Sequence, residues 1–478
     1  MNWEEETGVL IIGFGGAGAT AAITAHDFGA KVLIVEKMEK GGGNTTLSLG
    51  GFLSITDIDK GLLYLENLCN SICTTVGSDI LRVYVTQCHK NKDWVEGFGV
   101  STHVYGGASF PLLPGADAIE KRIIIGGKTK EGNAFWSLLK QQVEKRWIDL
   151  WKDSKAKDLI TDASGAVIGA TIQKGEKELA VKAINGVILT CGGFEYNESM
   201  KVNYLKGYPY YSFGSSGNTG DGIKMAQRVG ADLWHTSSVS VSLGFKAPDF
   251  DAAFMSHPPS NRFIYVDRNG KRFASEFAEH HAYHFIVDRF DPNTIDYPCI
   301  PCLMIFDETA CAAGPLVISA LGNNHDKYRW SKDNSQEMSR GWIVSDQTLA
   351  GLAKKIGLTP CVLEKTVNQY NYFCSIDEDQ DYNRPKEKLS PIGPGPYYAM
   401  NLWPCLINTQ GGPKRNQKAQ VLYPDGQPIP NLYSAGELGS LFGLLYQGAG
   451  NLGECLAFGR IAGREAASNL RYKVKGKR

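Results

Sequence analysis

Residues 8–36 read GVLIIGFGGAGATAAITAHDFGAKVLIVE. The apolar run at 8–12 is typical of a strand buried in a parallel sheet, and the run at 31–35 is a second one. Between them lie a G-x-G-x-x-G pattern at 13–18 and a run of small residues that suits a closely packed helix ending at Gly29. The stretch therefore predicts a strand, a helix and a second, parallel strand in one compact unit.

The glycine pattern has a physical reason at each position. Gly13 permits a tight turn, Gly15 lets a pyrophosphate approach the backbone, and Gly18 allows close packing of helix on strand. The N-terminus of the helix offers free amides and a positive dipole end to the same phosphates. Glu36 falls about 20 residues further on, where a carboxylate accepts the ribose hydroxyls. We therefore expect dinucleotide binding by Gly13, Gly15, Gly16, Ala17, Gly18 and Glu36.

Four later motifs occur in a fixed order along the chain. They read GVILTCGGF at 186–194, NTGDG at 218–222, NLYSAGE at 431–437 and FGRIAG at 458–463. Together with the N-terminal unit, this series resembles the fumarate reductase/succinate dehydrogenase flavoprotein superfamily over essentially the whole chain. The resemblance implies FAD as the cofactor.

The resemblance also implies an α/β fold with a Rossmann-like (glutathione-reductase-type) FAD-binding domain and an inserted α+β capping domain. We expect the FAD-binding domain at residues 1–245 and 405–478 and the capping domain at 246–404. The loop at 37–48 is expected to be flexible, and it has no histidine for attachment, so FAD is expected to be non-covalent. The resemblance adds these cofactor-binding residues: Lys37, Gly43, Asn44, Thr45, Thr46, Thr190, Gly192, Gly193, Asp221, Gly436, Glu437, Asn451 and Leu452.

The fumarate reductases of this superfamily use an arginine as proton donor and clamp the dicarboxylate with a histidine and a second arginine. In this chain the three positions fall on His280, Phe442 and Tyr446. Without those cations a small dianion has no bidentate anchor, so we do not expect fumarate as the substrate.

Residues 446–450 read YQGAG and resemble the Tyr-Pro-Gly-Ala-Gly element of the 3-ketosteroid Δ1-dehydrogenases, with Gln447 in place of proline. In that family the tyrosine hydroxyl and the last glycine amide hydrogen-bond a ketone oxygen and stabilise the developing enolate. The resemblance thus implies that Tyr446 and the Gly450 amide polarise a ketone while hydride passes to the flavin. Alternatively, Tyr446 is a core tyrosine packed under the flavin.

The catalytic base is less well defined. The family's tyrosine is replaced by His280, a suitable base near neutral pH, and Tyr283 is the alternative if the alignment is shifted. Alternatively, His280 is a surface or capping histidine without a catalytic role. Its pairing with His284 on a helix offers no obvious third ligand, so we expect no metal site. Pocket residues are expected at Tyr105, Phe110, Phe442 and Leu445, unless these simply form core.

Composition limits the partners. Lysine plus arginine and aspartate plus glutamate number 50 each, so no overall field attracts nucleic acid. No signal peptide or membrane-spanning stretch is evident, and eleven irregularly spaced cysteines favour a reducing compartment, so we expect a cytoplasmic protein. The expected partners are a small apolar ketone or enone and an external electron carrier such as a quinone.

Three functions remain open. The first is ketosteroid-type dehydrogenation or the reverse enone reduction. The second is reduction of another α,β-unsaturated carbonyl or carboxylate. The third is a flavin-binding sensory or structural module without turnover.

Overall fold

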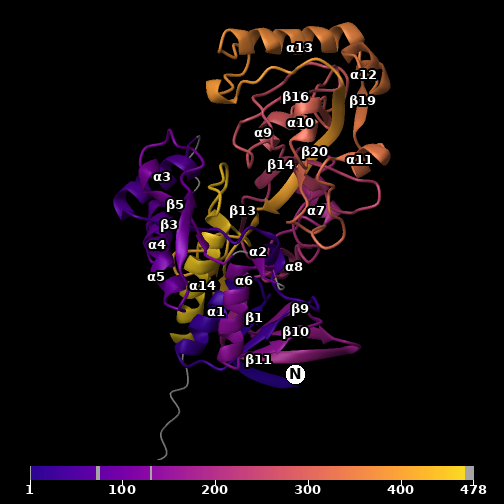
Figure 1. Cartoon of the computed structure of the whole chain (residues 1–478). Coiled ribbons are helices and arrows are strands. Elements are labelled where there is room, and N and C mark those ends of the chain that lie inside the picture. The colour runs from indigo at the N-terminus through magenta and orange to yellow at the C-terminus, as the bar shows by residue number, and fades with distance from the viewer. Residues whose placement is uncertain (1, 72–75, 127, 130–131, 469–478) are drawn as a thin grey trace, which may run out of the picture. The chain divides into compact units, whose positions relative to one another are not determined.

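The computed structural model describes residues 2–71, 76–126, 128–129 and 132–468 (Figure 1). The chain divides into two compact units. The first contains residues 1–200, 215–238 and 408–478, and the second contains 201–214 and 239–407. The sequence placed the inserted domain at 246–404 and assigned 201–214 to the FAD-binding part. Capping as the role of the second unit stays a prediction.

The first unit is built on a mostly parallel sheet, which confirms the expected α/β fold. Its strands lie in the order β22-β23-β11-β1-β2-β8, and β1 pairs in parallel with both β11 and β2. Strand β10 pairs antiparallel with β11, and β9 pairs antiparallel with β10. The bounds are β1 Glu5–Ile12, β2 Val32–Val35, β8 Asp149–Trp151, β9 Ser154–Thr161, β10 Val167–Lys174, β11 Lys177–Leu189, β22 Gln420–Leu422 and β23 Pro428–Ser434.

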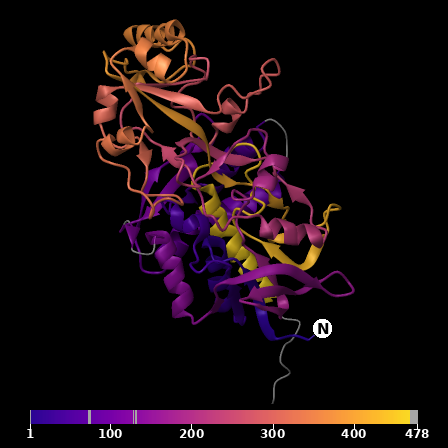
Figure 2. The same ribbon diagram turned by 90° about the vertical axis from the view of Figure 1, so that its right-hand side faces the viewer.

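Helices α1 (Gly16–Asp27) and α14 (Gly450–Ser468) pack closely on one another beside this sheet (Figure 2). Their contact depends on small residues. A methyl group on Gly463 would lie 2.5 Å from the Ala21 carbonyl oxygen, and one on Gly459 would lie 3.0 Å from that of Ala17. The small residues of α1 thus let the glycines of α14 approach its backbone closely.

The remaining elements of the first unit surround this centre. A small sheet, in the order β3-β5-β4, carries the loop at 105–110. The bounds are α2 Gly43–Leu47, β3 Phe52–Ile55, α3 Ile58–Cys69, α4 Ser78–His89, α5 Asn91–Glu96, β4 Thr102–Gly106, β5 Ile119–Ile124, α6 Ala134–Lys145, α8 Asp221–Arg228, β13 Leu233–Trp234 and β21 Gly412–Pro413.

The second unit has an eight-stranded sheet with a central path β16-β17-β20-β14-β15-β18, to which β12 and β19 add. An aromatic cluster fills one face and includes Phe245, Trp330 and Trp342. The bounds are β12 Tyr211–Ser212, β14 Val239–Phe245, β15 Phe254–Ser256, β16 Phe263–Val266, α9 His284–Val287, β17 Cys302–Asp307, α10 Glu308–Ala312, β18 Val317–Ile318, α11 Ser335–Ser339, β19 Val344–Asp346, α12 Leu349–Lys355, α13 Pro360–Ser375 and β20 Tyr397–Thr409.

Helix starts show where local reasoning held. Helix α13 begins at Pro360 after Thr359, with proline at the first helical position. Ser345 lies in β19, and α12 is capped by Thr348, whose hydroxyl accepts from the Gly351 amide. Both residues favour caps, and pairing of β19 with β20 decides between them.

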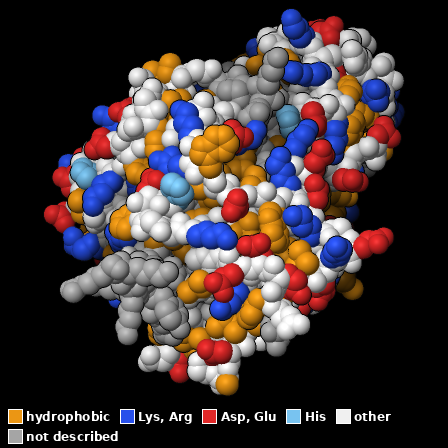
Figure 3. All heavy atoms as spheres, turned by 90° about the horizontal axis from the view of Figure 1, so that it is seen from below, with side chains coloured by type: hydrophobic (Ala, Val, Ile, Leu, Met, Phe, Trp, Pro, Cys, Tyr) orange, Lys and Arg blue, Asp and Glu red, His pale blue; other side chains and the backbone are white. Residues whose placement is uncertain are grey.

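Acidic and basic side chains are interspersed over the face drawn in Figure 3. Within the described part of the chain, no helix is both long and apolar enough to cross a membrane.

We expect Gly463→Ala to destabilise the protein by about 1–3 kcal/mol, because overpacking α1 against α14 outweighs the gain of about 1 kcal/mol in helix propensity. Denaturant unfolding of the variant measures this. Gly107→Ala is the control, since its methyl would meet only the Ile119 carbonyl oxygen at 3.5 Å. Equal stability of both variants would contradict the close packing.

Candidate functional site

The glycine turn lies between β1 and α1, at the carboxyl end of the sheet. Gly13 has a φ of 106°, and a methyl group on it would lie 2.5 Å from the Thr190 carbonyl oxygen. The Thr190 hydroxyl bonds the carbonyl oxygens of Ile12 and Gly13 at 2.9 Å. A methyl on Gly18 would lie 2.0 Å from the Gly13 oxygen. These contacts require glycine at both ends of the pattern.

Glu36 and Lys37 follow β2 at the same edge. The Glu36 carboxylate accepts from the Phe14 and Met38 amides, each at 2.8 Å, while burial raises its pKa. Lys37 pairs with Asp221 at 2.7 Å, which joins the end of β2 to the start of α8. The sequence motifs at 36–37 and 218–222 are therefore neighbours in space.

Residues 43–47, expected within a flexible loop, form the short helix α2. That expectation was wrong for these residues because tertiary hydrogen bonds order them. The Gly16 amide donates to the Thr45 hydroxyl at 3.0 Å. Asn44 accepts from the Ser215 amide at 2.7 Å. Gly43 and Thr46 lie on the same helix.

Two buried carboxyl groups meet beside α2. One Asn44 amide nitrogen donates to Glu195 and to Glu437, each at 2.9 Å, and Asn218 donates to Glu195 at 3.3 Å. Gly192 and Gly193 let the backbone that follows β11 approach Glu437, since a methyl on Gly193 would lie 2.3 Å from a Glu437 oxygen. Burial raises the pKa of both glutamates. Sequence reasoning missed Glu195, although it directly follows the GGF motif.

A buried ion pair supports the C-terminal part of the site. Arg415 contacts Glu454 at 2.6 Å, and both side chains are fully buried. Arg415 also donates to the carbonyl oxygens of Gly436 and Leu438, while Glu454 accepts from the Ser440 hydroxyl at 2.6 Å. Neither residue was singled out from the sequence, because nothing in the local pattern marks a buried charge.

Asn451 extends this network at the start of α14. Its amide nitrogen donates to Gln410 at 3.0 Å and to Glu454 at 3.1 Å, and its oxygen accepts from Asn408 at 2.6 Å. Leu452 packs partly buried against the core of this unit.

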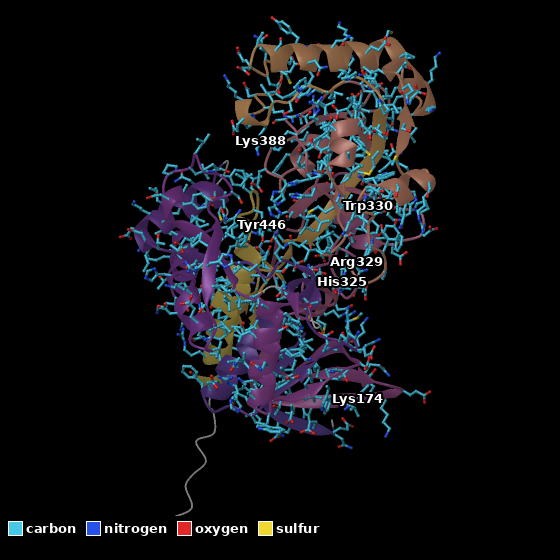
Figure 4. All side chains as sticks on the ribbon, in the orientation of Figure 1. Lys174, His325, Arg329, Trp330, Lys388 and Tyr446 are labelled. Atoms are coloured by element: carbon cyan, nitrogen blue, oxygen red, sulfur yellow. The ribbon has the colours of Figure 1, made fainter. Side chains whose placement is uncertain are left out.

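Tyr446 lies on the chain leading into α14 (Figure 4). Its hydroxyl oxygen accepts from the Asn451 amide at 3.3 Å, and its ring meets that of Phe442 edge-on at 5.3 Å. Burial raises the pKa of Tyr446, and the Asn451 amide partly opposes that rise. Tyr446 is therefore a protonated phenol at neutral pH, able to donate a hydrogen bond.

The Gly450 amide, expected to contact a ketone, donates instead to the Gln447 carbonyl oxygen at 2.8 Å. It serves a substrate oxygen only if this turn opens or shares its hydrogen. Ala449, at a φ of 68°, completes the turn.

Gln447 holds the loop at 105–110. Its fully buried side-chain oxygen accepts from the Tyr64 hydroxyl at 2.6 Å and from the Ser109 amide at 2.9 Å. The Ser109 hydroxyl accepts from the Gly448 amide at 3.0 Å and from Lys121 at 3.1 Å. A proline at 447 would make none of the side-chain contacts.

The predicted pocket residues differ in exposure. Tyr105 is 43% exposed, whereas Phe110 and Leu445 are partly buried against the core. Phe442 is 1% exposed and lies under the Tyr446 ring, so it supports that tyrosine from within the core.

His280 and Tyr283 belong to the second unit. His280 is exposed, with Nδ1 3.3 Å from a Glu279 oxygen, and its helical pairing with His284 was wrong because α9 begins at His284. Tyr283 is 3% exposed and packs on Tyr265. Ligand atoms of Glu279, His280 and His281 lie within 4.8 Å of one another and could hold a divalent metal.

The buried arginines of the second unit are neutralised locally. Arg272 bonds Glu276 and Asp379, and Arg384 bonds Glu276. The free-energy cost of burying these charges is thus offset within the unit, because each guanidinium group is paired with carboxylates of the same unit.

The residues at the sheet edge fit FAD. The first turn of α1 follows Gly15, which caps it with no side chain, so its amides can face a phosphate. The buried Glu437 Oε1 has no hydrogen-bond partner among the described residues, so it suits a hydroxyl of the cofactor. Fold and site together define a dinucleotide-binding flavoprotein.

The chain belongs to the FAD binding domain family, whose profile matches residues 8–452, within the fumarate reductase/succinate dehydrogenase flavoprotein superfamily. It is an FAD-dependent oxidoreductase. It is 26% identical to the NADH:fumarate oxidoreductase of Klebsiella pneumoniae over 97% of this chain and 48% of that protein. It is 28% identical to the urocanate reductase of Eggerthella lenta over 96% of this chain and 74% of that protein.

The chain thus spans about half the length of the first relative and about three quarters of the second. Among solved structures, the fold resembles 3-ketosteroid Δ1-dehydrogenase from Sterolibacterium denitrificans in complex with 1,4-androstadiene-3,17-dione. The TM-score is 0.86 at 22% identity, and the match covers 97% of this chain and 100% of that chain.

We expect Arg415→Met to destabilise the protein by about 3–5 kcal/mol, because Glu454 would remain buried without its cation. Denaturant unfolding measures the loss. The double variant Arg415→Met/Glu454→Gln should recover part of it. Lys60→Met, which removes an exposed partner of Asp117, is the control and should change little. A small effect of Arg415→Met would show that the pair is not needed.

Proposed function

We propose that the protein transfers hydride between FAD and the β-carbon of a ketone, next to the α-carbon that loses or gains the proton, as in 3-ketosteroid dehydrogenation or the reverse enone reduction. The observation that carries this is Tyr446, a partly buried, protonated phenol whose oxygen accepts from the Asn451 backbone amide. A donor fixed in this way is preorganised for a carbonyl oxygen that gains negative charge in the transition state.

The chain's own residues supply binding and proton handling. Tyr446 donates to the ketone oxygen and stabilises the enolate when the neighbouring α-proton leaves. The residue that takes that proton, or returns it in the reductive direction, stays a prediction from the sequence: His280 or, alternatively, Tyr283. FAD, when bound, would supply the hydride-accepting or hydride-donating chemistry. The Gly450 amide is a second donor once the turn to Gln447 opens.

The site argues against a small dicarboxylate. Phe442 and Tyr446 occupy two positions where the fumarate reductases carry cations, and Phe442 is in the core. Arg272 and Arg384 are neutralised by Glu276 and Asp379. The similarity in fold to a ketosteroid dehydrogenase supports a ketone, and the partly buried Phe110 and Leu445 are proposed as apolar walls for it.

A second candidate is reduction of an α,β-unsaturated carboxylate. It is favoured by Lys121, whose ammonium group lies 3.1 Å from the Ser109 hydroxyl, beside the Gly448 amide. This cation stands next to the Tyr446–Gly450 segment. The names of the two sequence relatives, reductases of fumarate and urocanate, agree with such chemistry.

We also propose that FAD is held non-covalently and that electrons are exchanged with an external carrier such as a quinone. In the described part of α2 and the turn before it, residues 37–48 contain no histidine that could attach the cofactor.

We expect Tyr446→Phe to retain FAD and to lower turnover on a ketone by about a hundredfold or more, because the enolate oxygen loses a donor. Steady-state kinetics and the flavin spectrum measure the two effects. Tyr372→Phe, on an exposed face of α13, is the control. Near-normal turnover in Tyr446→Phe would remove this residue from the mechanism.

The substrate class is tested by anaerobic titration of the purified flavoprotein. Saturated 3-ketosteroids and simple cyclic ketones are expected to bleach the oxidised flavin band. Bleaching by none of them, together with reoxidation of the reduced protein by an unsaturated carboxylate, would instead support the second candidate. No change of the flavin spectrum with any ketone, enone or enoate would contradict both candidate functions and favour a non-catalytic flavin module.

A further inference from the structure

The carboxyl groups of Glu195 and Glu437 are placed together by three separate elements. Glu195 follows β11, Glu437 follows β23, and Asn44 lies on α2. One Asn44 amide nitrogen bridges the two, at 2.9 Å from Glu195 Oε1 and 2.9 Å from Glu437 Oε2. The other oxygen of each glutamate faces Gly193, where a methyl would lie 2.9 Å and 2.3 Å from them. The two side chains therefore share one enclosed space.

This space holds little charge to balance two carboxylates. Glu195 is fully buried and Glu437 is 8% exposed. The amides that donate to them, from Asn44 and Asn218, are neutral. Two buried like charges in contact disfavour each other's ionised form.

Two cations on nearby segments of the described chain are already paired. On the segment before β22, Arg415 is bound to Glu454 of α14, at 2.6 Å. After β2, Lys37 is bound to Asp221 of α8, at 2.7 Å. Cys455 and Tyr446, among the described residues, also face the pair, and burial raises the pKa of both, so both stay protonated and neutral.

We propose that Glu195 and Glu437 share a single proton and act as one acid–carboxylate pair that binds the FAD hydroxyls. The shared proton holds the two carboxyl groups together and leaves oxygens of Glu437 as acceptors for the cofactor, whereas two carboxylates would repel each other. Glu195 is thereby a positioning residue of the cofactor site, acting through Glu437. The inference rests on the cofactor and is independent of the substrate proposed above.

The sign of the pH dependence follows from the direction of both shifts. Burial raises the pKa of Glu195 and of Glu437, and the Glu195 charge raises that of Glu437 further. The folded protein thus holds more protons than the unfolded chain above the ordinary carboxyl pKa. The stabilisation by the shared proton is present at low pH and is lost as pH rises through the raised values.

The test is the FAD dissociation constant of Glu195→Gln, measured by flavin fluorescence quenching on apoprotein reloaded with FAD, from about pH 6 to about pH 9. Wild-type affinity should weaken by about tenfold or more over this range, because the pair loses its proton. The variant should vary by about twofold or less, since a glutamine amide cannot ionise but keeps an acceptor for Asn44 and Asn218. Equal slopes in both proteins would overturn the proposal.

Two further measurements keep the result decisive. Glu178→Gln removes an exposed carboxylate of β11 and should retain the wild-type slope. If Glu195→Gln fails to fold, infrared spectroscopy of the wild-type holoprotein at neutral pH should show the carbonyl band of a protonated carboxylic acid. Absence of any such band would overturn the shared proton without a variant. Neither readout depends on turnover, so a wrong substrate assignment would leave both unchanged.

Discussion

The buried pair of Arg415 and Glu454 is the contact on which the candidate site depends. Arg415 holds the carbonyl oxygens on either side of Glu437, and Glu454 binds the Ser440 hydroxyl and the Leu441 amide. The strand end that carries Glu437 and the turn that leads to Tyr446 are thereby fixed to one helix, α14. A charge pair can do this in the interior because each partner also satisfies backbone groups, which offsets the cost of removing both ions from water.

Helix packing in the first unit brings the cofactor residues and Tyr446 to the same region. Small residues let α1 and α14 approach, and that approach places the N-terminus of α14 beside the glycine turn after β1. Asn451 then connects the helix start with Gln410 and with the Tyr446 hydroxyl, through its side chain and its backbone amide respectively. Cofactor contacts and the proposed ketone donor are therefore adjacent parts of one hydrogen-bonded framework.

Much of this framework could be predicted from the sequence, and the limits have physical causes. The βαβ unit was predictable because residues 8–36 combine two apolar strand runs, the glycine spacing and a terminal acid. Each of these features depends only on residues within that stretch. Helix α2 was missed because its order comes from Gly16 and Ser215, which are remote in sequence. Glu195, Arg415 and Glu454 were missed for the same reason: a buried polar residue is defined by its partners. The cap of α12 depended on strand pairing, which no local preference reveals.

Gln447 links two parts of the site that a proline at the same position would leave independent. Its oxygen ties the loop at 105–110 to the segment that carries Tyr446, and Tyr64 anchors the same oxygen from α3. Movement of this loop would therefore strain the Gln447 contacts and act on the backbone that positions the Tyr446 ring. Because Gln447 directly follows Tyr446, the position of the loop and that of the phenol are coupled through a single side chain.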